Sequence, residues 1–585
     1  MTGFLGFAPI YANGLLALVV VFVLPGILLV RPMDLPNAPQ RWLAIFLGSM
    51  VFNHLFVTLI ALLRLDPITC YRVAVTVMIG AVAGFAFKDR RSPQGHPSVG
   101  AAIVTPSDIR YALVGAVVLA LAYFNIWKYG VPHIFGESDV SISWNRWALI
   151  WSQGLFPTFS YGYPQLIPTL WAVTYIFTGS NEHYFAYYIH VVLLIVPIVL
   201  TAMVLGRNNW GRPASLIFVF VWFVSEVREG WLRATLHEGF PDWVAAVCAF
   251  CGAALFINGK PGNRFDKDQI ATALFSLCLL SFAAATKPIF GLFAVAVLAA
   301  ICIDAAKHLD RRDRNRFCIA AIGLFAAIVT AYVLTYWHLA FRSMPHYPVS
   351  DLSERLSRAL GLFNRNFTFL FRILAIAGLV ISPFLPRVRW LALPLWISIS
   401  VWANTASYDL RNVLGPLAIC AFIPVYAVTP ARATRRDVSG ERRWIVPDAA
   451  MILGVATMSI ALTLNLASGD AALKARFADD QLKEGSGREV NQKVGEILER
   501  GCTMLTGNAY LYTIAAFQPF KDQLQYSTFG QAIGDPSLAA LREPKGCTGI
   551  LYVPGRTHQS VLDFIAAASF RKVIETDSTV LLMSN

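Results

Sequence analysis

Long apolar runs, separated by short polar segments, fill the chain from its first residues to about position 465. Each run approaches the roughly 20 residues that an α-helix needs to cross a bilayer. We expect membrane helices at about 13–30, 43–63, 71–87, 111–127, 186–204, 214–226, 241–258, 268–285, 289–304, 317–337, 367–384, 389–404, 411–428 and 446–465. The pattern therefore predicts an all-α polytopic membrane protein with about fourteen transmembrane helices.

The composition agrees with a membrane protein. Hydrophobic residues make up 56% of the 585 residues, charged residues only 14%, and the mean hydropathy is +0.56. A soluble domain carries about 25% charged residues. The net charge of +13 does not indicate nucleic-acid binding, because the basic residues are spread over many short loops rather than gathered on one face.

The basic residues fall in loops on one side of the predicted topology. These loops are 88–91, 207–212, 260–267, 307–316, 387–389 and 432–443. Lys and Arg collect in cytoplasmic loops, so this side is expected to be cytoplasmic. The pattern holds only if the run 166–177, "LIPTLWAVTYIF", does not cross the membrane. That run is too short for a full crossing and follows Pro164, so we interpret it as re-entrant or interfacial.

The opposite side, which is periplasmic in a Gram-negative bacterium, receives several longer segments. They are the loop 128–185, the loops around 227–240 and 338–366, and the tail 466–585. The tail is long enough for a small domain. Its polar helical stretch precedes the strand-like segments "CTMLTGN", "GILYVP" and "TVLLMSN", so we expect an α/β domain.

Two pairs of cysteines call for different interpretations. Cys502 and Cys547 lie in the external tail, each beside a predicted strand. An oxidising compartment permits a disulfide between them, and two unpaired buried thiols are the alternative. Cys248 and Cys251 form a C-x-x-C motif inside an apolar helix, where cysteine more often serves as a small buried hydrophobic residue.

The segment "GESDVSISWNRWA", residues 136–148, places acids and tryptophans together in the first long external loop. One face of a helix starting there would carry Val140, Trp144, Trp147, Ala148 and Trp151. That spacing predicts an amphipathic helix at the membrane interface, with its tryptophans at headgroup depth. Asp139 would lie at the helix N-terminus, where the helix dipole favours an ionised acid. A helix cap or a solvated loop acid is the alternative for Glu137 and Asp139.

Further polar and aromatic residues are predicted on the same external side. They are Tyr161 and Tyr163 in "YGYPQLIPTLW", Arg233, His237, Glu238 and Asp242 in "REGWLRATLHEGFPDW", and Lys287 and Arg411 at helix ends. Snorkelling toward the headgroups explains such a lysine or arginine individually. Their shared side, against the positive-inside trend, also suits a groove that binds a lipid phosphate.

The arrangement resembles the integral-membrane glycosyltransferases of the GT-C fold, particularly the bacterial relatives of the aminoarabinose lipid A transferase and of the protein O-mannosyltransferases. Asp139 lies where that family places a catalytic or donor-site carboxylate, and "YGYPQLIPTLW" resembles its Pro-rich segment. "RATLHEGFPDWVAAVCAF" resembles its second acidic motif, while "TKPIFG" and "YDLRNVLGPL" resemble its Lys-Pro turn and its late Arg motif. The resemblance covers about residues 111–428. The chain departs from the family in three helices that precede the usual first one, in the E-S-D form of the acid motif, and in Tyr163, where some relatives carry a lysine.

The resemblance implies transfer of a sugar from a polyprenyl-phosphate-linked donor to an envelope glycolipid, polysaccharide or protein acceptor at the periplasmic face of the inner membrane. An inverting single displacement needs a base near the acceptor hydroxyl and cations on the leaving phosphate. By the resemblance, Asp139 would be the base, with Asp242 and Glu137 assisting. The phosphate ligands would be Lys287, Arg411 and Arg233, and the substrate groove would contain Trp144, Tyr161, Tyr163, His237 and Glu238.

The resemblance also implies three parts of the chain. Residues 1–110 would form extra N-terminal membrane helices, 111–465 a GT-C-like catalytic module, and 466–585 the periplasmic α/β domain. No cofactor is certain. A divalent metal stays open, although the external histidines His133, His183, His237, His338 and His346 lack the spacing of a recognised site.

Two other functions remain as alternatives. An O-antigen ligase or polymerase would use a diphosphate-linked glycan, and the loop 338–366 offers Arg342, His346, Arg355 and Arg358 for such a donor. A lipid or solute transporter would carry charges along a pathway within its helices. Most of the charges here are expected at one face of the membrane, which is less typical of a transporter.

Overall fold

The computed structural model describes residues 2–33, 35, 38–91, 140–157, 163–179, 184–206, 239–259, 266–338, 352–405, 410–428 and 487–507, with shorter stretches within 216–223 and 511–584. The chain divides into two compact units. The first is Met1–Tyr123, Trp147–Ser180 and Tyr188–Leu462, and the second is Phe124–Arg146, Asn181–Tyr187 and Thr463–Asn585.

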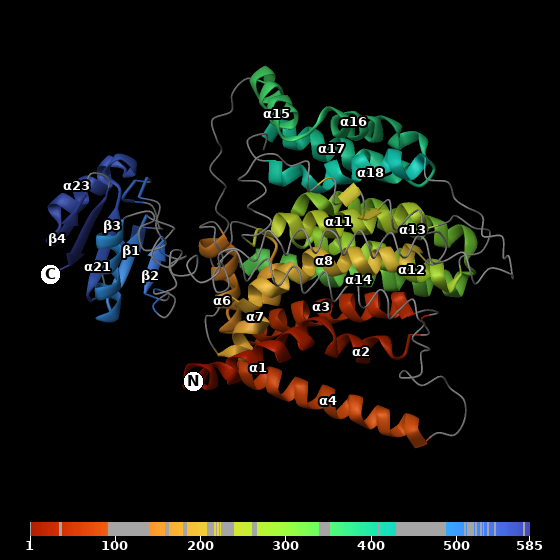
Figure 1. The fold of residues 1–585 in the computed structure, drawn as a ribbon, viewed down its shortest axis with the longest axis horizontal. Coiled ribbons are helices and arrows are strands. Elements are labelled where there is room, and N and C mark those ends of the chain that lie inside the picture. The colour runs from red at the N-terminus through yellow and green to blue at the C-terminus, as the bar shows by residue number, and fades with distance from the viewer. Residues whose placement is uncertain are drawn as a thin grey trace. The chain divides into compact units, whose positions relative to one another are not determined.

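The first unit is helical. Its helices are α1 Thr2–Phe22, α2 Leu24–Val30, α3 Ala38–Leu63, α4 Pro67–Arg91, α6 Arg146–Ser152, α7 Leu166–Thr178, α8 Tyr184–Gly206, α11 Pro241–Asn258, α12 Lys267–Ala284, α13 Gly291–His308, α14 Arg311–His338, α15 Leu352–Asn366, α16 Phe369–Ile381, α17 Arg389–Thr405 and α18 Leu414–Val428. Figure 1 shows the long helices running in a common direction, with α1–α4 on one side of α8 and α11–α14, and α16–α18 on the other side.

Eight stretches of the described residues are long and apolar enough to cross a membrane. They are Ala12–Val30, Ala38–Leu63, Pro67–Phe85, Phe185–Leu205, Pro241–Asn258, Lys267–Ala284, Pro288–His308 and Leu410–Val428. Each overlaps a span predicted from the sequence. The predicted spans 317–337, 367–384 and 389–404 are helical, in α14, α16 and α17, but do not belong to these eight. The predicted spans 111–127 and 446–465, and most of 214–226, lie outside the described residues, so the total of fourteen stays a prediction.

The short apolar run after Pro164 forms α7. The helix has 13 residues and is therefore about 20 Å long, less than the roughly 30 Å of a bilayer core. Every residue from Leu166 to Ile176 is buried, and α7 packs against α1 and α3. The burial of α7 shows that it does not lie exposed on the membrane surface, and the choice between an interfacial and a re-entrant segment stays a prediction.

The tryptophan segment differs from its prediction in one respect. It forms a π-helical turn, Val140–Asn145, followed by α6. The predicted apolar face is buried, but Ser143 and Asn145 are buried as well. Trp147 and Trp151 are 2% and 0% exposed. These side chains are enclosed by protein rather than exposed to lipid, and the depth of the segment in the membrane stays a prediction.

Helix α11 is the most deeply buried helix described in the first unit. All of its residues, Pro241–Asn258, are buried, and α12 and α18 pack against it. Gly252 permits the close approach of α12, because a Cβ there would lie 2.8 Å from Leu280 Cγ. The Ser276 hydroxyl donates to the Gly252 carbonyl across the same contact, at 2.7 Å. Cys248 and Cys251 are buried free thiols on this helix.

The second unit contains the α/β fold expected of the tail. Its elements are α21 Arg488–Glu499, β1 Thr503–Thr506, β2 Leu524–Tyr526, α22 Ala539–Arg542, β3 Thr548–Tyr552, α23 Gln559–Ala567, β4 Phe570–Glu575 and β5 Val580–Ser584. The strand order is β2-β1-β3-β5-β4. β1 runs parallel to β2 and β3, whereas β5 is antiparallel to β3 and β4. The three strands predicted from the sequence are β1, β3 and β5.

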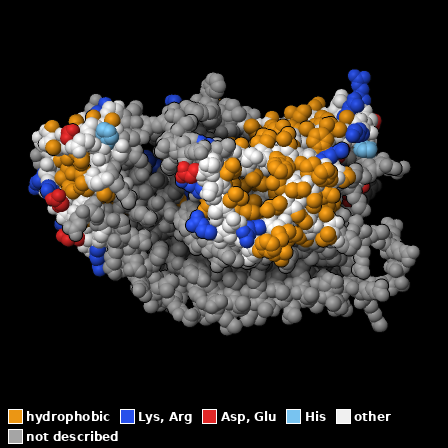
Figure 2. Space-filling model, turned by 90° about the horizontal axis from the view of Figure 1, so that it is seen from above, with side chains coloured by type: hydrophobic (Ala, Val, Ile, Leu, Met, Phe, Trp, Pro, Cys, Tyr) orange, Lys and Arg blue, Asp and Glu red, His pale blue; other side chains and the backbone are white. Residues whose placement is uncertain are grey.

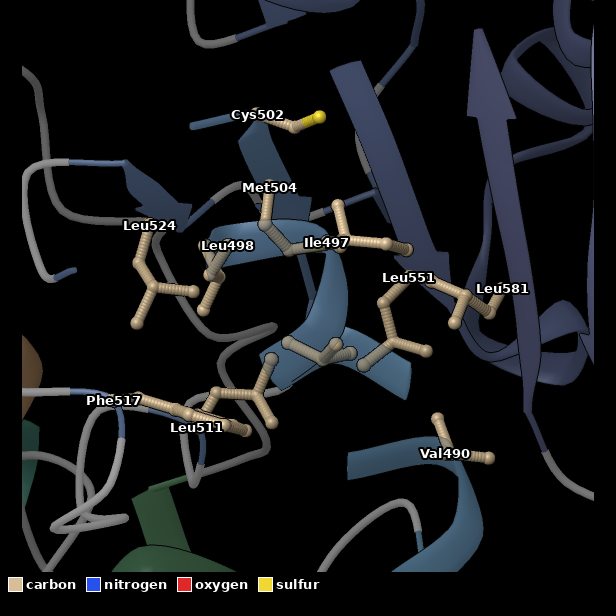
Figure 3. Close-up of a cluster of buried hydrophobic side chains, with 11 residues drawn as sticks. Val490, Ile497, Leu498, Cys502, Met504, Leu511, Phe517, Leu524, Leu551 and Leu581 are labelled. Carbon is tan, nitrogen blue, oxygen red and sulfur yellow. The ribbon is translucent and has the colours of Figure 1, made fainter. Parts of the chain in front are cut away.

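Helix α21 covers one face of this sheet. Its apolar residues, among them Val490, Ile497 and Leu498, point toward Met504 of β1 and Leu551 of β3 (Figure 3). Cys502 and Cys547, the two cysteines considered for a disulfide, are joined by one. The residues that follow them begin the paired strands β1 and β3, so the disulfide closes the end of that pair.

Candidate functional site

The first turn of α11 carries Asp242. Pro241 precedes it at the start of the helix, a position that suits proline because the first helical N–H has no partner within the helix. Phe240 is the N-cap residue, with extended backbone and no capping hydrogen bond from its side chain. The Asp242 side chain is only 2% exposed.

Lys287 lies at a sharp turn between α12 and the short 3₁₀ helix Pro288–Phe290 that leads into α13. Pro288 restricts Lys287 to extended backbone, which has φ −139° and ψ 120°. The Lys287 N–H donates to the Ala283 carbonyl at 2.7 Å, and the Thr286 hydroxyl donates to the Phe282 carbonyl at 2.8 Å. These hydrogen bonds fix the turn from which the Lys287 side chain extends.

These two side chains form a buried ion pair. Lys287 Nζ lies 2.7 Å from Asp242 Oδ1, and the lysine side chain is 13% exposed. The positive end of the α11 dipole adds to the stabilisation of the carboxylate. Taking two charges out of water carries a large desolvation cost, which helix capping alone does not require. Buried ionisable groups in membrane proteins more often mark functional sites.

The charge state of Lys287 follows from its neighbours. Burial by itself favours the neutral amine, but the Asp242 carboxylate outweighs burial and raises the pKa of Lys287 above its ordinary value of 10.5. Tyr163 acts in the same direction, and Arg411 opposes it. Lys287 is therefore an ammonium ion across the neutral range, as a ligand for a phosphate must be.

Arg411 brings a second cation to this end of α11. It lies in the 3₁₀ helix Leu410–Val413, directly before α18, and its charge acts on both Asp242 and Lys287. The guanidinium carbon lies 4.4 Å from the centre of the Phe240 ring. Gly415, one turn further on, permits the close packing of α18, since a Cβ there would lie 2.7 Å from Phe290 Cζ.

An aromatic wall adjoins the lysine. Lys287 Nζ lies 5.0 Å from the centre of the Tyr163 ring, in cation–π geometry. The Tyr163 ring in turn stacks on Trp147 of α6, with ring centres 6.2 Å apart. Trp147 is enclosed by protein, so the partly exposed Tyr163 ring is the member of this stack that could contact a ligand beside the charged groups.

Gln165 links the backbone of Tyr163 to α6 through hydrogen bonds. Its side-chain amide donates to the Tyr163 carbonyl at 2.9 Å, and its side-chain oxygen accepts from Trp151 Nε1 at 3.1 Å. The next residue, Leu166, donates its N–H to the Ala285 carbonyl at 3.2 Å. The start of α7 is therefore hydrogen-bonded to the turn that carries the lysine.

The structure brings together four of the residues proposed from the sequence: Asp242, Lys287, Arg411 and Tyr163. Trp144 is 4% exposed and lies in the π-helical turn before α6. The other proposed site residues lie outside the described residues; they are Asp139, Glu137, Arg233, Tyr161, His237 and Glu238. Their roles stay predictions.

Sequence reasoning missed Phe240, Gln165 and Gly415. Gln165 is a single polar residue entering an apolar run, a signal that could have been followed. Gly415 stands in "LRNVLGP", and a glycine beside a helix-start proline suggests close packing. The contact between Phe240 and Arg411 leaves no signal in the sequence, because it depends on how α11 and α18 meet.

A metal site is not apparent here. Within the described ranges, no group of three or more His, Cys, Asp or Glu side chains lies close enough to hold an ion. Asp242 is already paired with Lys287. The external histidines considered from the sequence lie outside the residues whose side chains are described.

Comparison with solved structures finds similarity to ArnT from Cupriavidus metallidurans. The structure bound to undecaprenyl phosphate is similar with a TM-score of 0.47 and 12% identity, covering 81% of this chain and 98% of that chain. The apo structure gives a TM-score of 0.46 and 13% identity over 81% of this chain and 97% of that chain. ArnT is the aminoarabinose lipid A transferase, one of the proteins whose motifs the sequence resembles. No protein-family model and no curated protein matches the chain.

Proposed function

We propose that this chain is an integral-membrane glycosyltransferase that transfers a sugar from a polyprenyl-phosphate-linked donor to an envelope glycolipid, polysaccharide or protein acceptor. The observation that supports it most is the buried pair of Asp242 and Lys287 with Arg411 beside it. Two cations held at one end of a helix bundle, next to an aromatic wall, suit the phosphate of a lipid carrier.

The proposed reaction is a single displacement with inversion. The acceptor hydroxyl attacks the anomeric carbon, the bond from that carbon to the phosphate oxygen breaks, and polyprenyl phosphate leaves. Lys287 and Arg411 stabilise the negative charge that develops on the phosphate. Asp139 accepts the hydroxyl proton, with Glu137 assisting, and Arg233 is a further phosphate ligand. Asp242 positions the Lys287 ammonium and binds a sugar hydroxyl.

The placement of charges supports an external site. The loops 307–316 and 387–389, which carry the predicted cytoplasmic arginines, belong to the same end of the bundle, because Arg387 bonds to Asp304 of α13 and to the last turn of α11. The Asp242–Lys287 pair lies at the opposite end of α11, about 27 Å away along an 18-residue helix. With the basic end in the cytoplasm, the paired end faces the periplasm.

Envelope chemistry in a strain that lacks the gene tests the proposal. Wild type, Asp242→Asn and the matched control Asp304→Asn, a residue of α13 whose partner Arg387 caps the other end of α11, are expressed at equal levels. Mass spectrometry of envelope glycolipids, polysaccharides and proteins then measures the modification. We expect wild type and Asp304→Asn to add a sugar-sized mass, and Asp242→Asn to lose it by about 100-fold or more. Full activity of Asp242→Asn would contradict the assigned site, and no added mass from wild type would contradict the transferase.

The same experiment separates the alternatives. A ligase or polymerase would add an oligosaccharide rather than one sugar, and a transporter would add no mass. Within the described residues, Arg355 donates to the Asn404 carbonyl and Arg358 pairs with Glu354. These contacts do not decide between the two donors, because the Arg358–Glu354 pair is exposed and Lys287 itself has a carboxylate partner; the added mass decides.

A further inference from the structure

Helix α3 carries a buried histidine within an apolar sequence. His54 is 1% exposed, and its Nδ1 lies 2.7 Å from the hydroxyl oxygen of Thr169 on α7, a helix that packs against α3. On the face seen in Figure 2, hydrophobic side chains spread over the middle of the helical unit, with Lys and Arg toward both ends of the apolar area. A polar side chain buried in such a bundle must find its hydrogen bonds within the protein. The contact between α3 and α7 is therefore a specific polar one.

The hydrogen bonds of Thr169 determine which atom of His54 carries a proton. The Thr169 hydroxyl donates to the Leu166 carbonyl at 2.7 Å. A hydroxyl has one hydrogen, so the Thr169 oxygen accepts from His54, and Nδ1 is the donor. His54 Nε2 is buried and has no hydrogen-bond partner among the described residues. A buried polar atom without a partner lowers stability, so packing alone does not explain a histidine at this position.

The hydrogen bonds continue from α7 to the turn that carries Lys287. The Leu166 N–H donates to the Ala285 carbonyl at 3.2 Å. Ala285 lies two residues before Lys287, whose own N–H donates to the Ala283 carbonyl in the same turn. Leu166 and Ala285 are 1% and 2% exposed, so water does not compete for the bond between them. His54 is thus joined to the backbone of the Lys287 turn through one turn of α7.

The same turn of α7 supports the aromatic side of the site. The Thr169 N–H donates to the Gln165 carbonyl at 3.0 Å, and the Gln165 side-chain amide donates to the Tyr163 carbonyl at 2.9 Å. The Tyr163 ring centre lies 5.0 Å from Lys287 Nζ. The start of α7 therefore supports both the backbone from which the lysine extends and the ring beside its ammonium group.

The course of α3 brings His54 to this level of the bundle. At the start of α3, the Gln40 side-chain amide donates to the Asp268 carbonyl in the first turn of α12, at 3.2 Å, and the two helices pack together. At 1.5 Å per residue, His54 lies about 21 Å further along α3, and α12 ends about 24 Å further on, just before the Lys287 turn. The two helices thus reach the site side by side.

We infer that His54 is a positioning residue for Lys287. Through Thr169 and the first turn of α7, it fixes the turn from which the lysine extends. The inference rests on the proposed function for what Lys287 binds, the phosphate of the lipid-linked donor. Helix α3 precedes the part of the chain that resembles the GT-C family, residues 111–428. The site thus depends on a helix outside that resemblance.

Two substitutions of His54 and one matched control test the inference in the full-length protein. The side-chain amide nitrogen of His54→Asn takes about the place of Nδ1, whereas the amide of His54→Gln reaches the place of Nε2. The control Tyr71→Phe removes another buried hydrogen bond of α3, from the Tyr71 hydroxyl to Asn53 Oδ1 at 3.0 Å. Hydrogen exchange by mass spectrometry, in detergent, reports on the peptides that contain Leu166 and Lys287. Transfer of radiolabelled sugar per folded molecule is measured beside it.

We expect His54→Gln to raise exchange in these two peptides at least about tenfold and to lower kcat/KM about tenfold. His54→Asn and Tyr71→Phe should stay within about twofold of wild type in both measurements. Wild-type exchange or wild-type transfer in His54→Gln would overturn the inference. Losses as large in His54→Asn or in Tyr71→Phe would also overturn it, because His54 would then act only through overall stability.

The exchange measurement separates this inference from the proposed function. No transfer of sugar by wild type would contradict the proposed function alone. The exchange rates would still decide whether His54 holds the Lys287 turn, because they do not depend on the reaction that the chain catalyses.

Discussion

An ion pair lies near each end of α11, yet the two pairs are built differently. At the N-terminal end, Asp242 and Lys287 are 2.7 Å apart and their side chains are 2% and 13% exposed. At the C-terminal end, Arg387 and Asp304 are 3.6 Å apart with side chains 16% and 28% exposed. Both arrangements suit the helix dipole, which favours an anion at the first turn and a cation at the last.

The difference lies in what each pair does for the helix. Arg387 donates to the Phe256 carbonyl in the last turn of α11, at 3.2 Å, so it is a cap and satisfies a carbonyl that the helix leaves open. Asp242 follows an N-cap residue without a side-chain hydrogen bond, and pairs with Lys287 instead. A second cation, Arg411, and the Tyr163 ring also belong to this end. Helix capping thus explains the Arg387 end, whereas the start of α11 holds a buried ion pair that capping does not require.

Replacing the cation at each end of α11 should give the largest difference in activity between the two ends. Lys287→Met leaves the Asp242 carboxylate buried without its partner, so we expect about 100-fold lower transfer activity and a loss of about 3 kcal/mol in stability. Arg387→Met removes a partly exposed pair and one capping hydrogen bond, so we expect a loss of about 1–2 kcal/mol with transfer activity within about twofold of wild type. Transfer of radiolabelled sugar per folded molecule, with thermal unfolding in detergent, measures both effects.

A fall of activity in Arg387→Met as large as that in Lys287→Met would show that both ends act only through stability. The distinction drawn between cap and site would then be wrong. Lys287→Arg provides a further check, since it keeps the charge near Asp242 but changes its geometry. Partial activity in that variant is the outcome that agrees with a phosphate ligand.

Replacing one glycine near each end of α11 should give a second, smaller difference in activity between the two ends. A Cβ at Gly415 would meet the Phe290 ring at 2.7 Å and Ala246 Cα at 3.2 Å, so Gly415→Ala requires a shift of the Phe290 ring, which follows the Lys287 turn, or of the start of α18, which follows Arg411. We expect about tenfold lower activity. A Cβ at Gly259 would meet the guanidinium of Arg387 and lie at ordinary contact distance, 3.5 Å, from the Phe256 carbonyl oxygen. Gly259→Ala should therefore displace the Arg387 cap, lower stability by about 1 kcal/mol and leave activity unchanged. Steady-state kinetics of both variants measure this, and equal activities would refute the role assigned to the Gly415 contact.

The smallest expected effect is a pH dependence confined to alkaline conditions. The folded protein raises the pKa of Lys287, so the stability that its charge provides is fully present below the ordinary value of 10.5 and is lost as pH rises through the higher folded value. The difference in unfolding free energy between wild type and Lys287→Met should stay constant from about pH 7 to pH 10 and shrink above that. Denaturation in detergent at a series of pH values measures it. A difference that disappears near neutral pH would mean that Lys287 is not held as an ammonium by Asp242.

Much of the helical architecture could be predicted because hydrophobic burial in lipid is a local property of the sequence. Eight apolar stretches predicted as spans are helices of sufficient length. Asp242, Lys287 and Arg411 could be proposed together because each follows a break in an apolar run on the same predicted side. The burial of Trp147 and Trp151 by protein could not be predicted, since an amphipathic pattern does not distinguish lipid from neighbouring protein as the apolar partner.

The sequence alone determined which segments form long apolar helices, although their bounds differ by several residues, as in α3 with Ala38–Leu63 against the predicted 43–63. It also predicts that the arginines collect on one side of the membrane and that acids and cations stand together on the other. Hydropathy and charge act on each segment separately, so they leave a signal in the sequence. Only the tertiary structure decided that Lys287 reaches Asp242 rather than water, that Gly415 lets α18 pack closely on Phe290 and α11, and that Arg387 caps the far end of α11. These contacts join segments distant in the chain, and their geometry follows from close packing between whole helices.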